Sequence, residues 1–114
     1  MNPYTYILVR TDLPPIQMAV QACHAALQAG FTFEEPGTVS SIVLLGVASE
    51  TELRDAAATL ELHNVDHHLF YEPDFGPMGY SALASRPIEL KRERKLFANY
   101  SKLDLFEQKG KHYA

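Results

Sequence analysis

Two kinds of pattern alternate along the chain: short runs of aromatic and β-branched residues, and longer stretches with helical spacing of apolar positions. The short runs predict strands at residues 4–10, 41–47, 67–71 and 80–84. The second run is nearly all apolar, which is typical of a central strand covered on both faces. Residues 74–79, between the last two runs, contain two glycines and a proline. They predict a turn that pairs these two strands antiparallel.

Three helices are expected around these strands. The first starts at Pro14-Pro15, runs to Leu27 or Ala29 and stops at Gly30, because proline is tolerated in a first turn and glycine favours helix ends. The second opens with a capping box, Ser49 with Glu52 reaching back, and ends at Asn64. The third spans residues 88–97, and residues 31–41 form a loop.

The order of these elements predicts a single-domain α/β fold. A three-layer sandwich is expected, with a four-stranded mixed sheet flanked by helices. Residues 1–106 form the domain, and residues 107–114 are expected to be a frayed tail.

Composition agrees with an ordinary globular protein and excludes several classes. The chain has 114 residues, 46% of them hydrophobic and 21% charged, which argues against disorder. No run approaches the roughly 20 apolar residues of a membrane helix, and the start lacks the basic region of a secretory signal. A single cysteine, Cys23, forms no internal disulfide and no multi-cysteine zinc site, so a cytoplasmic location is expected. No metal or cofactor is expected either.

Charge is distributed unevenly. Residues 1–85 carry two basic and ten acidic residues, whereas residues 86–114 carry eight basic and four acidic ones. The C-terminal quarter is therefore the part suited to a polyanion, although a basic segment can equally complement the acidic body or form a solvated helix end.

The first predicted helix carries an uncharged polar stripe. Gln17, Gln21, His24 and Gln28 follow one another at steps of four, three and four, which places them on one helix face. No charged residue occurs from Leu13 to Phe33, although solvated helix faces normally carry charge. The stripe is expected at the rim of a cleft. The alternative is a weakly charged surface helix in which His24 is structural.

The same region resembles a known family. Leu8-Val-Arg-Thr-Asp-Leu13 followed by Met18-Ala-Val-Gln-Ala-Cys-His-Ala-Ala26 is similar to the amino-terminal signature of the archaeal/eukaryotic-type (type II) peptidyl-tRNA hydrolases. Later segments, including Tyr71-Glu-Pro73 and Ala84-Ser-Arg-Pro87, resemble a short divergent branch of "peptidyl-tRNA hydrolase domain-containing" proteins. The likeness spans about residues 5–97 and implies a four-stranded mixed sheet flanked by helices.

The resemblance implies site residues, and the chain departs from the family pattern at some of them. The family's catalytic lysine corresponds to Gln17, and its active-site threonine corresponds best to Ser81. Its active-site aspartate corresponds to either Asp74 or Glu72. His24 is the implied base that activates water, oriented by one of these carboxylates, with Gln17, Gln21 or Ser81 as hydrogen-bond donors to the developing oxyanion.

The implied activity is hydrolysis of the ester between a peptide, or an amino acid, and tRNA. The phosphates of such a substrate need cations, and the candidates are Arg10, Arg86, Lys91, Arg92, Arg94 and Lys95. The alternative is a weakly active or inactive module of the same fold that binds a nucleotide-like ligand or a protein partner. A homodimer is compatible with either function.

Other candidate sites are weaker. Cys23 and His24 are helix neighbours that point about 100° apart, so they do not form a nucleophile pair. His63 with His67 or His68 lacks the further ligands of a zinc site. Asp12 is expected to be structural and to fix the turn before the first helix through backbone amides near Pro14.

Overall fold

The strand β1 (Tyr4–Arg10) lies in the middle of the sheet, as expected for a segment whose residues 6–9 are all buried. In the computed structural model, which describes residues 2–103, β1 pairs parallel with β2 (Ser41–Val47) and antiparallel with β4 (Gly79–Ser85). β3 (His67–Glu72) continues the sheet beyond β4 through antiparallel pairing, as predicted from the turn between them. The sheet is thus mixed, in the order β3-β4-β1-β2-β5.

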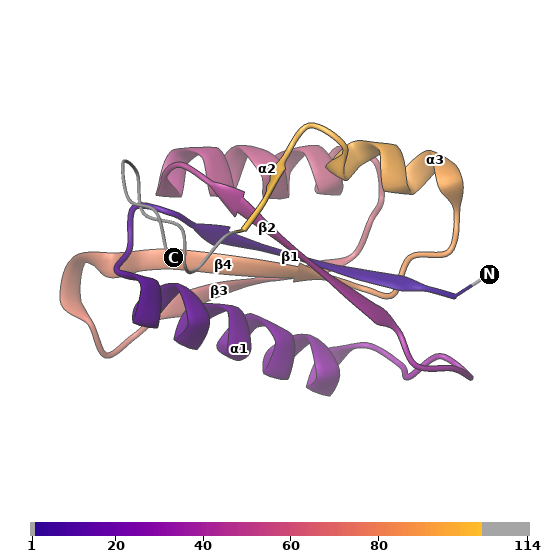
Figure 1. Cartoon of the computed structure of the whole chain (residues 1–114), viewed down its shortest axis with the longest axis horizontal. Coiled ribbons are helices and arrows are strands. Elements are labelled where there is room, and N and C mark those ends of the chain that lie inside the picture. Colours follow the sequence, from indigo (N-terminus) through magenta and orange to yellow (C-terminus); the bar gives the residue numbers. More distant parts are fainter. Residues whose placement is uncertain (1, 104–114) are drawn as a thin grey trace, which may run out of the picture.

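Helices cover both faces of this sheet (Figure 1). The helix α1 (Pro15–Thr32) lies on one face, and α2 (Glu50–Leu62) and α3 (Lys91–Arg94) lie on the other. Alternation along β1 builds both contacts, because successive strand residues point to opposite faces. Ile7 and Val9 pack under α1, whereas Tyr6 and Leu8 pack under α2. The predicted three-layer α/β sandwich is confirmed.

The predicted capping and end residues are confirmed for α2, whereas the predicted end of α1 at Gly30 is wrong. Ser49 Oγ accepts the amide of Glu52 at 3.2 Å, the Glu52 carboxylate accepts the amide of Ala48, and Asn64 adopts a positive φ of 59° after the helix. The first helix, however, passes through Gly30 and ends at Thr32. Gly30 therefore does not act as a helix terminator. Instead, the last carbonyls are satisfied by Thr32 Oγ1 on Gln28 and by the amide of Phe33 on Ala29.

The C-terminal region differs most from expectation. A helix over residues 88–97 was predicted, but Ile88 forms a two-way backbone bridge with Tyr4, at 2.7 and 2.8 Å. Helical geometry begins only at Lys91 and tightens into the 3₁₀ turn η2 (Lys95–Phe97). A fifth strand, β5 (Ser101–Lys102), then pairs antiparallel with β2, so the sheet has five strands rather than the predicted four. The tail expected at residues 107–114 lies outside the described residues.

Within residues 2–103, none of the helices combines the length and the apolar character needed to cross a membrane.

Candidate functional site

A buried glutamine joins α1 to the two strands beneath it. The Gln21 side chain is fully buried, and its Nε2 donates to Glu72 Oε1 at 2.7 Å. Its Oε1 accepts the hydroxyl proton of Ser81 at 2.5 Å. Glu72 and Ser81 are also buried, at 2% and 0% exposure. A buried amide and a buried carboxylate are stable only when they are hydrogen-bonded, so these three side chains depend on one another. We call Gln21, Glu72 and Ser81 the Gln21 network.

The Glu72 and Ser81 side chains both point toward α1. Regular strand alternation explains this for Glu72, and a β-bulge explains it for Ser81. Phe70 packs with the α1-side residues, so Glu72, two positions later, points to the same face. On β4 the pairing slips: Phe70 faces Ala82, whereas Tyr71 faces Tyr80. Ser81 is therefore the extra residue of a β-bulge. Such a bulge reverses the alternation locally, so Ser81 and Ala82 both reach the α1 face.

His24 lies one helical turn beyond Gln21 on α1 and packs against β3. Its ring stacks on Phe70, with centroids 4.7 Å apart and an angle of 5° between the planes. Unlike the Gln21 network, His24 is only half-buried. It therefore presents an imidazole at the surface while one ring face is held by an aromatic side chain.

The Glu72 carboxylate is held in its ionised form. The hydrogen bond from Gln21 is the largest cause that lowers the pKa of Glu72, followed by the Asp74 backbone amide at 3.0 Å. Desolvation opposes these effects, and the nearby His24 adds a smaller lowering of the pKa. The Glu72 carboxylate thus lies near the imidazole of His24, on the α1 side of the sheet.

Of the other site residues suggested by the sequence, Gln17 contacts the Gln21 network, whereas the Asp74 side chain does not. Gln17 joins it, because its Oε1 accepts a second bond from Gln21 Nε2 at 3.3 Å. Between the two candidate carboxylates, Glu72 lies in the network, whereas Asp74 contributes its backbone amide and its side chain is exposed.

Arg10 and Glu50 bind the backbone at residues 78–80, just before the bulge. The Arg10 guanidinium donates to the carbonyl oxygens of Met78 and Tyr80, and it forms a bidentate ion pair with Asp12 at 2.8 and 2.9 Å. This pairing lowers the pKa of Asp12. The partner of Asp12 is therefore Arg10 rather than the backbone amides near Pro14 that the sequence had suggested.

From α2, Glu50 accepts the amide of Tyr80 at 2.8 Å. A Cβ atom at Gly79, where φ is 68°, would collide with the same carboxylate, so this close approach requires glycine. Sequence reasoning missed Glu50, since nothing local indicates that its carboxylate reaches a strand 30 residues away.

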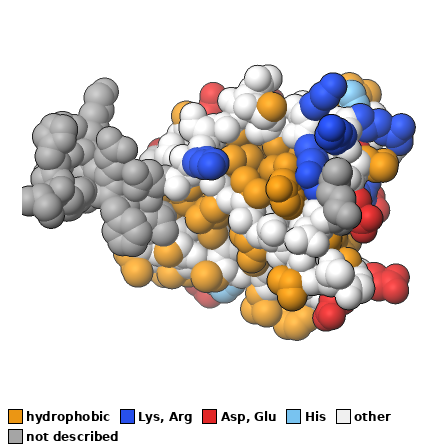
Figure 2. Space-filling view, turned by 45° about the vertical axis from the view of Figure 1, so that its right-hand side comes forward, with side chains coloured by type: hydrophobic (Ala, Val, Ile, Leu, Met, Phe, Trp, Pro, Cys, Tyr) orange, Lys and Arg blue, Asp and Glu red, His pale blue; other side chains and the backbone are white. Residues whose placement is uncertain are grey.

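The basic candidates lie away from the Gln21 network, apart from Arg10. Figure 2 shows Lys and Arg side chains gathered over the part of the molecule where α3 lies. Arg86 pairs with Glu93 at 2.8 and 3.1 Å, and the Arg94 guanidinium lies 3.9 Å from the centre of the Tyr4 ring. Lys91, Arg92 and Lys95 are exposed. Tyr4 begins β1 and Arg10 ends it, so this basic group and the network lie at opposite ends of the sheet.

Among residues 2–103, no three His, Cys, Asp or Glu side chains gather in a way that could hold a metal ion.

The lowered pKa of Glu72 gives stability a defined pH dependence. Because the folded-state pKa lies below the unfolded one, the stabilisation is fully present above about pH 4.3, where an ordinary glutamate titrates. It is lost as the pH falls through the folded-state value. We therefore expect Glu72→Gln to lower the unfolding free energy at pH 7 and to weaken its fall on acidification, as measured by urea unfolding at several pH values.

Asp74→Asn is the matched control, because it removes an exposed carboxylate but keeps the backbone amide that Glu72 accepts. It should leave both the stability and its pH profile close to those of the wild type. Equal profiles for Glu72→Gln and the wild type would contradict the hydrogen-bonded carboxylate.

Comparison with known proteins finds a curated relative and solved structures with a similar fold. The chain is 34% identical over 83 residues to the human protein named "Putative peptidyl-tRNA hydrolase PTRHD1", in an alignment that covers 59% of each chain. It thus spans less than two thirds of that relative. A solved structure of an Agrobacterium tumefaciens protein of unknown function, Atu0240, superimposes with a TM-score of 0.66 at 14% identity, over 91% of this chain and 99% of that one, which shows the fold alone. No family model matches. The chain is therefore similar to a protein that carries the peptidyl-tRNA hydrolase name, in agreement with the resemblance of its first-helix signature to that family.

Proposed function

We propose that the chain hydrolyses the ester bond of peptidyl-tRNA or of a related aminoacyl ester. The observation that carries this proposal is the buried Glu72 carboxylate, held by Gln21 near the half-buried imidazole of His24. The name of the human relative supports the same reaction class. The exposed Cys23 on α1 fits the reducing cytoplasm in which such substrates occur.

In the proposed reaction His24 removes a proton from water as the water attacks the ester carbonyl. The ester C–O bond then breaks and the imidazolium returns the proton to the departing ribose oxygen, which releases the carboxylic acid and the tRNA. The imidazolium that forms is stabilised by the negative charge of Glu72, which contributes to lowering the barrier electrostatically. Gln21 already donates through Nε2 to both Glu72 and Gln17, so it serves as a positioning residue. Gln17, which is half-buried and anchored through its Oε1, is the proposed donor to the developing oxyanion.

A binding module of the same fold is the second candidate function, and the neutral side chain at position 17 favours it. The hydrolases that this chain resembles carry a lysine at this position. In addition, residues 1–85 have a net charge of −8, which is unfavourable for an anionic tRNA substrate. In that case the surface around His24 binds a nucleotide-like ligand or a protein partner without turnover.

The two functions differ in what His24 does. If it is the general base, His24→Ala should reduce deacylation of N-acetyl-aminoacyl-tRNA by about 10²–10⁴-fold, because the water is no longer activated. The matched control is His63→Ala, an exposed histidine beyond α2, which should retain the wild-type rate. Equal rates for the wild type and His24→Ala would contradict the hydrolase proposal.

The same assay separates the functions through position 17. Gln17→Lys introduces a charged donor beside Gln21, and under the hydrolase proposal it should raise the rate, since charged donors stabilise an oxyanion more strongly than neutral ones. Under the binding-module function, neither the wild type nor Gln17→Lys shows turnover.

We also propose that Lys91, Arg92 and Lys95 contact tRNA phosphates at a distance from the reacting ester. Ser81 lies in β4, and Arg86 follows the last residue of that strand. At the rise of an extended chain these five residues span about 17 Å, which equals the length of about five base pairs. One nucleic-acid stem is therefore long enough to reach both the network and the basic group. The ion pair of Arg86 and the stacking of Arg94 leave these three exposed residues as the stronger candidates.

Replacing all three with alanine should weaken tRNA binding at low salt. The slope of log affinity against log salt should fall by about 0.9 for each phosphate that the variant no longer neutralises. Lys102→Ala, an exposed lysine on β5, is the control and should retain the wild-type slope. Filter binding between about 50 and 200 mM salt measures the slope, and an unchanged slope in the triple variant would contradict this placement of the substrate.

A further inference from the structure

Among residues 2–103, the outer edge of β2 has no strand partner at its N-terminal end, beside a hollow on the α1 face. The amide of Ser41 and the carbonyl of Val47 form hydrogen bonds on the β1 side of β2. Backbone groups alternate in direction along a strand, so odd-numbered residues of β2 bond toward β1 and even-numbered ones point away from it. Among the described residues, β5 pairs with Leu45 and Gly46, and the amide of Leu103 reaches the carbonyl of Leu44. Ile42 therefore directs its N–H and C=O to an edge that no described strand covers.

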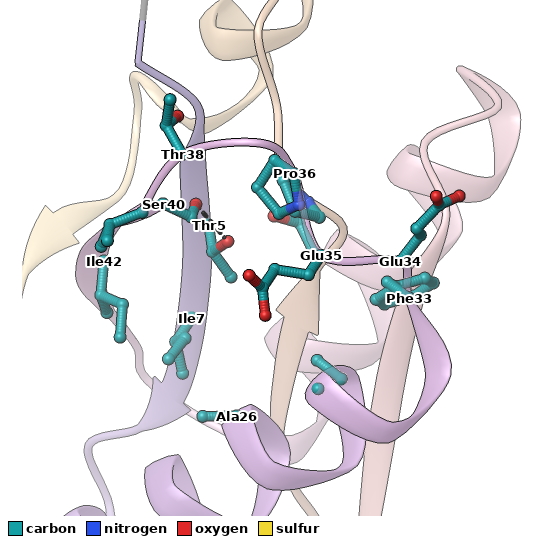
Figure 3. Close-up of a pocket in the computed structure, with 15 residues that line it drawn as sticks. Thr5, Ile7, Ala26, Phe33, Glu34, Glu35, Pro36, Thr38, Ser40 and Ile42 are labelled. Atoms are coloured by element: carbon teal, nitrogen blue, oxygen red, sulfur yellow. Dashed lines mark hydrogen bonds between the residues drawn. The ribbon is translucent and has the colours of Figure 1, made fainter.

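The hollow next to this edge has an apolar floor. It measures about 460 Å³ and lies between the C-terminal half of α1, the N-terminal halves of β1 and β2, and the loop at residues 33–40 (Figure 3). Ile7, Ala26 and Ala29 line its base. Ile42 and Val39 beside it remain 64% and 87% exposed. Exposed apolar residues around a hollow mark a binding surface more often than isolated ones do.

The hollow also carries a negative charge. Figure 3 shows the Glu35 carboxylate pointing into the hollow, toward Thr5 and Ile7. An adjoining hollow shares Glu35 and is lined further by Asp66 and Glu89, and its one cation, Arg86, is already paired with Glu93. No described residue forms an ion pair with Glu35. The electrostatic field here therefore attracts a cation.

We propose that this edge and hollow bind a peptide in extended conformation, one that presents an apolar side chain followed two positions later by a basic one. The peptide adds to β2 antiparallel, along the line that β5 begins. Strand alternation places side chains two positions apart on one face. An apolar residue opposite Ile42 thus enters the hollow, and the basic residue reaches the loop that carries Glu35.

A second copy of the chain fits the edge less well. A two-fold pairing of β2 edges places the same surface of both copies together, which brings both Glu35 loops into one interface. Like charges in such an interface repel each other. A basic peptide instead neutralises the carboxylate, and its site is separate from the Gln21 network, so its test does not depend on any hydrolase activity.

The probe is a fluorescein-labelled peptide, acetyl-Thr-Leu-Thr-Lys-Thr-amide, titrated into the full chain and followed by anisotropy. We expect saturable binding, weakened about fivefold by Glu35→Lys because the ion pair becomes a repulsion. Glu61→Lys, which changes an exposed carboxylate on α2, is the matched control and should bind like the wild type. The peptide with Glu in place of Lys should bind more weakly to the wild type and recover on Glu35→Lys.

Hydrogen exchange of the Ile42 amide tests whether the peptide adds to β2 as a strand. The Ile42 amide should exchange rapidly with solvent in the free chain and become protected when the peptide binds. Ile42→Pro removes this outward N–H together with the isoleucine side chain beside the hollow, so it should abolish binding, while the pairing of β2 with β1, which does not use this N–H, persists. Ile42→Val, which keeps the N–H and an apolar side chain, should still bind. Absence of peptide binding overturns the proposal, and so does equal weakening by Glu35→Lys and Glu61→Lys. An Ile42 amide already protected in the free chain also overturns it, since the edge is then occupied by a second copy or by residues 104–114.

Discussion

The candidate site depends on one buried side chain, Gln21, and on its need for hydrogen-bond partners. A glutamine amide enclosed between a helix and a sheet is stable only when both its donor and its acceptor groups are paired. Gln21 meets this requirement with Glu72 on β3 and Ser81 on β4, so a single residue of α1 ties two neighbouring strands to the helix. The arrangement also fixes which way the amide faces, because only its Nε2 can donate to the carboxylate.

The geometry of the sheet makes this pairing possible. Regular alternation along β4 would turn Ser81 toward α2, the side on which Tyr80 and Leu83 pack. The bulge at Ser81 redirects its hydroxyl to Gln21, and the contacts of Arg10 and Glu50 hold the backbone just before it. The charged residues near the ends of β1 and α2 thus support the network through the backbone of another strand. His24 then receives its position from α1 and from the ring of Phe70.

Residue patterns that act over a few positions were sufficient to predict much of the fold. The four strands, the capping of α2 by Ser49 and its end at Asn64 follow from local composition and local hydrogen bonds. The bridge of Ile88 to Tyr4 and the short strand β5 depend on partners far away in the sequence, which local patterns do not reveal. Gly30 was misread because helix propensity is a weak signal next to the packing of Ala29 and the bonding of Thr32 and Phe33 at the actual helix end.

The same division applies to the site. The spacing of Gln17, Gln21 and His24 predicted a shared helix face, and the contacts of α1 agree with it. Sequence alone left Glu72 and Asp74 as alternatives, because the choice depends on which strand position faces α1. It also could not foresee that Arg10, Arg86 and Arg94 each have a partner within the fold, since guanidinium partners are set by tertiary contacts.

The side-chain amide of Gln21 provides the most direct measurement of the network. NMR spectra of the folded chain should show two separate Nε2 proton signals that exchange slowly with water, one of them shifted downfield by its bond to Glu72. In Glu72→Gln that downfield shift should disappear while the fold persists. A rapidly exchanging Gln21 amide with the signals of a solvent-exposed glutamine would contradict the account.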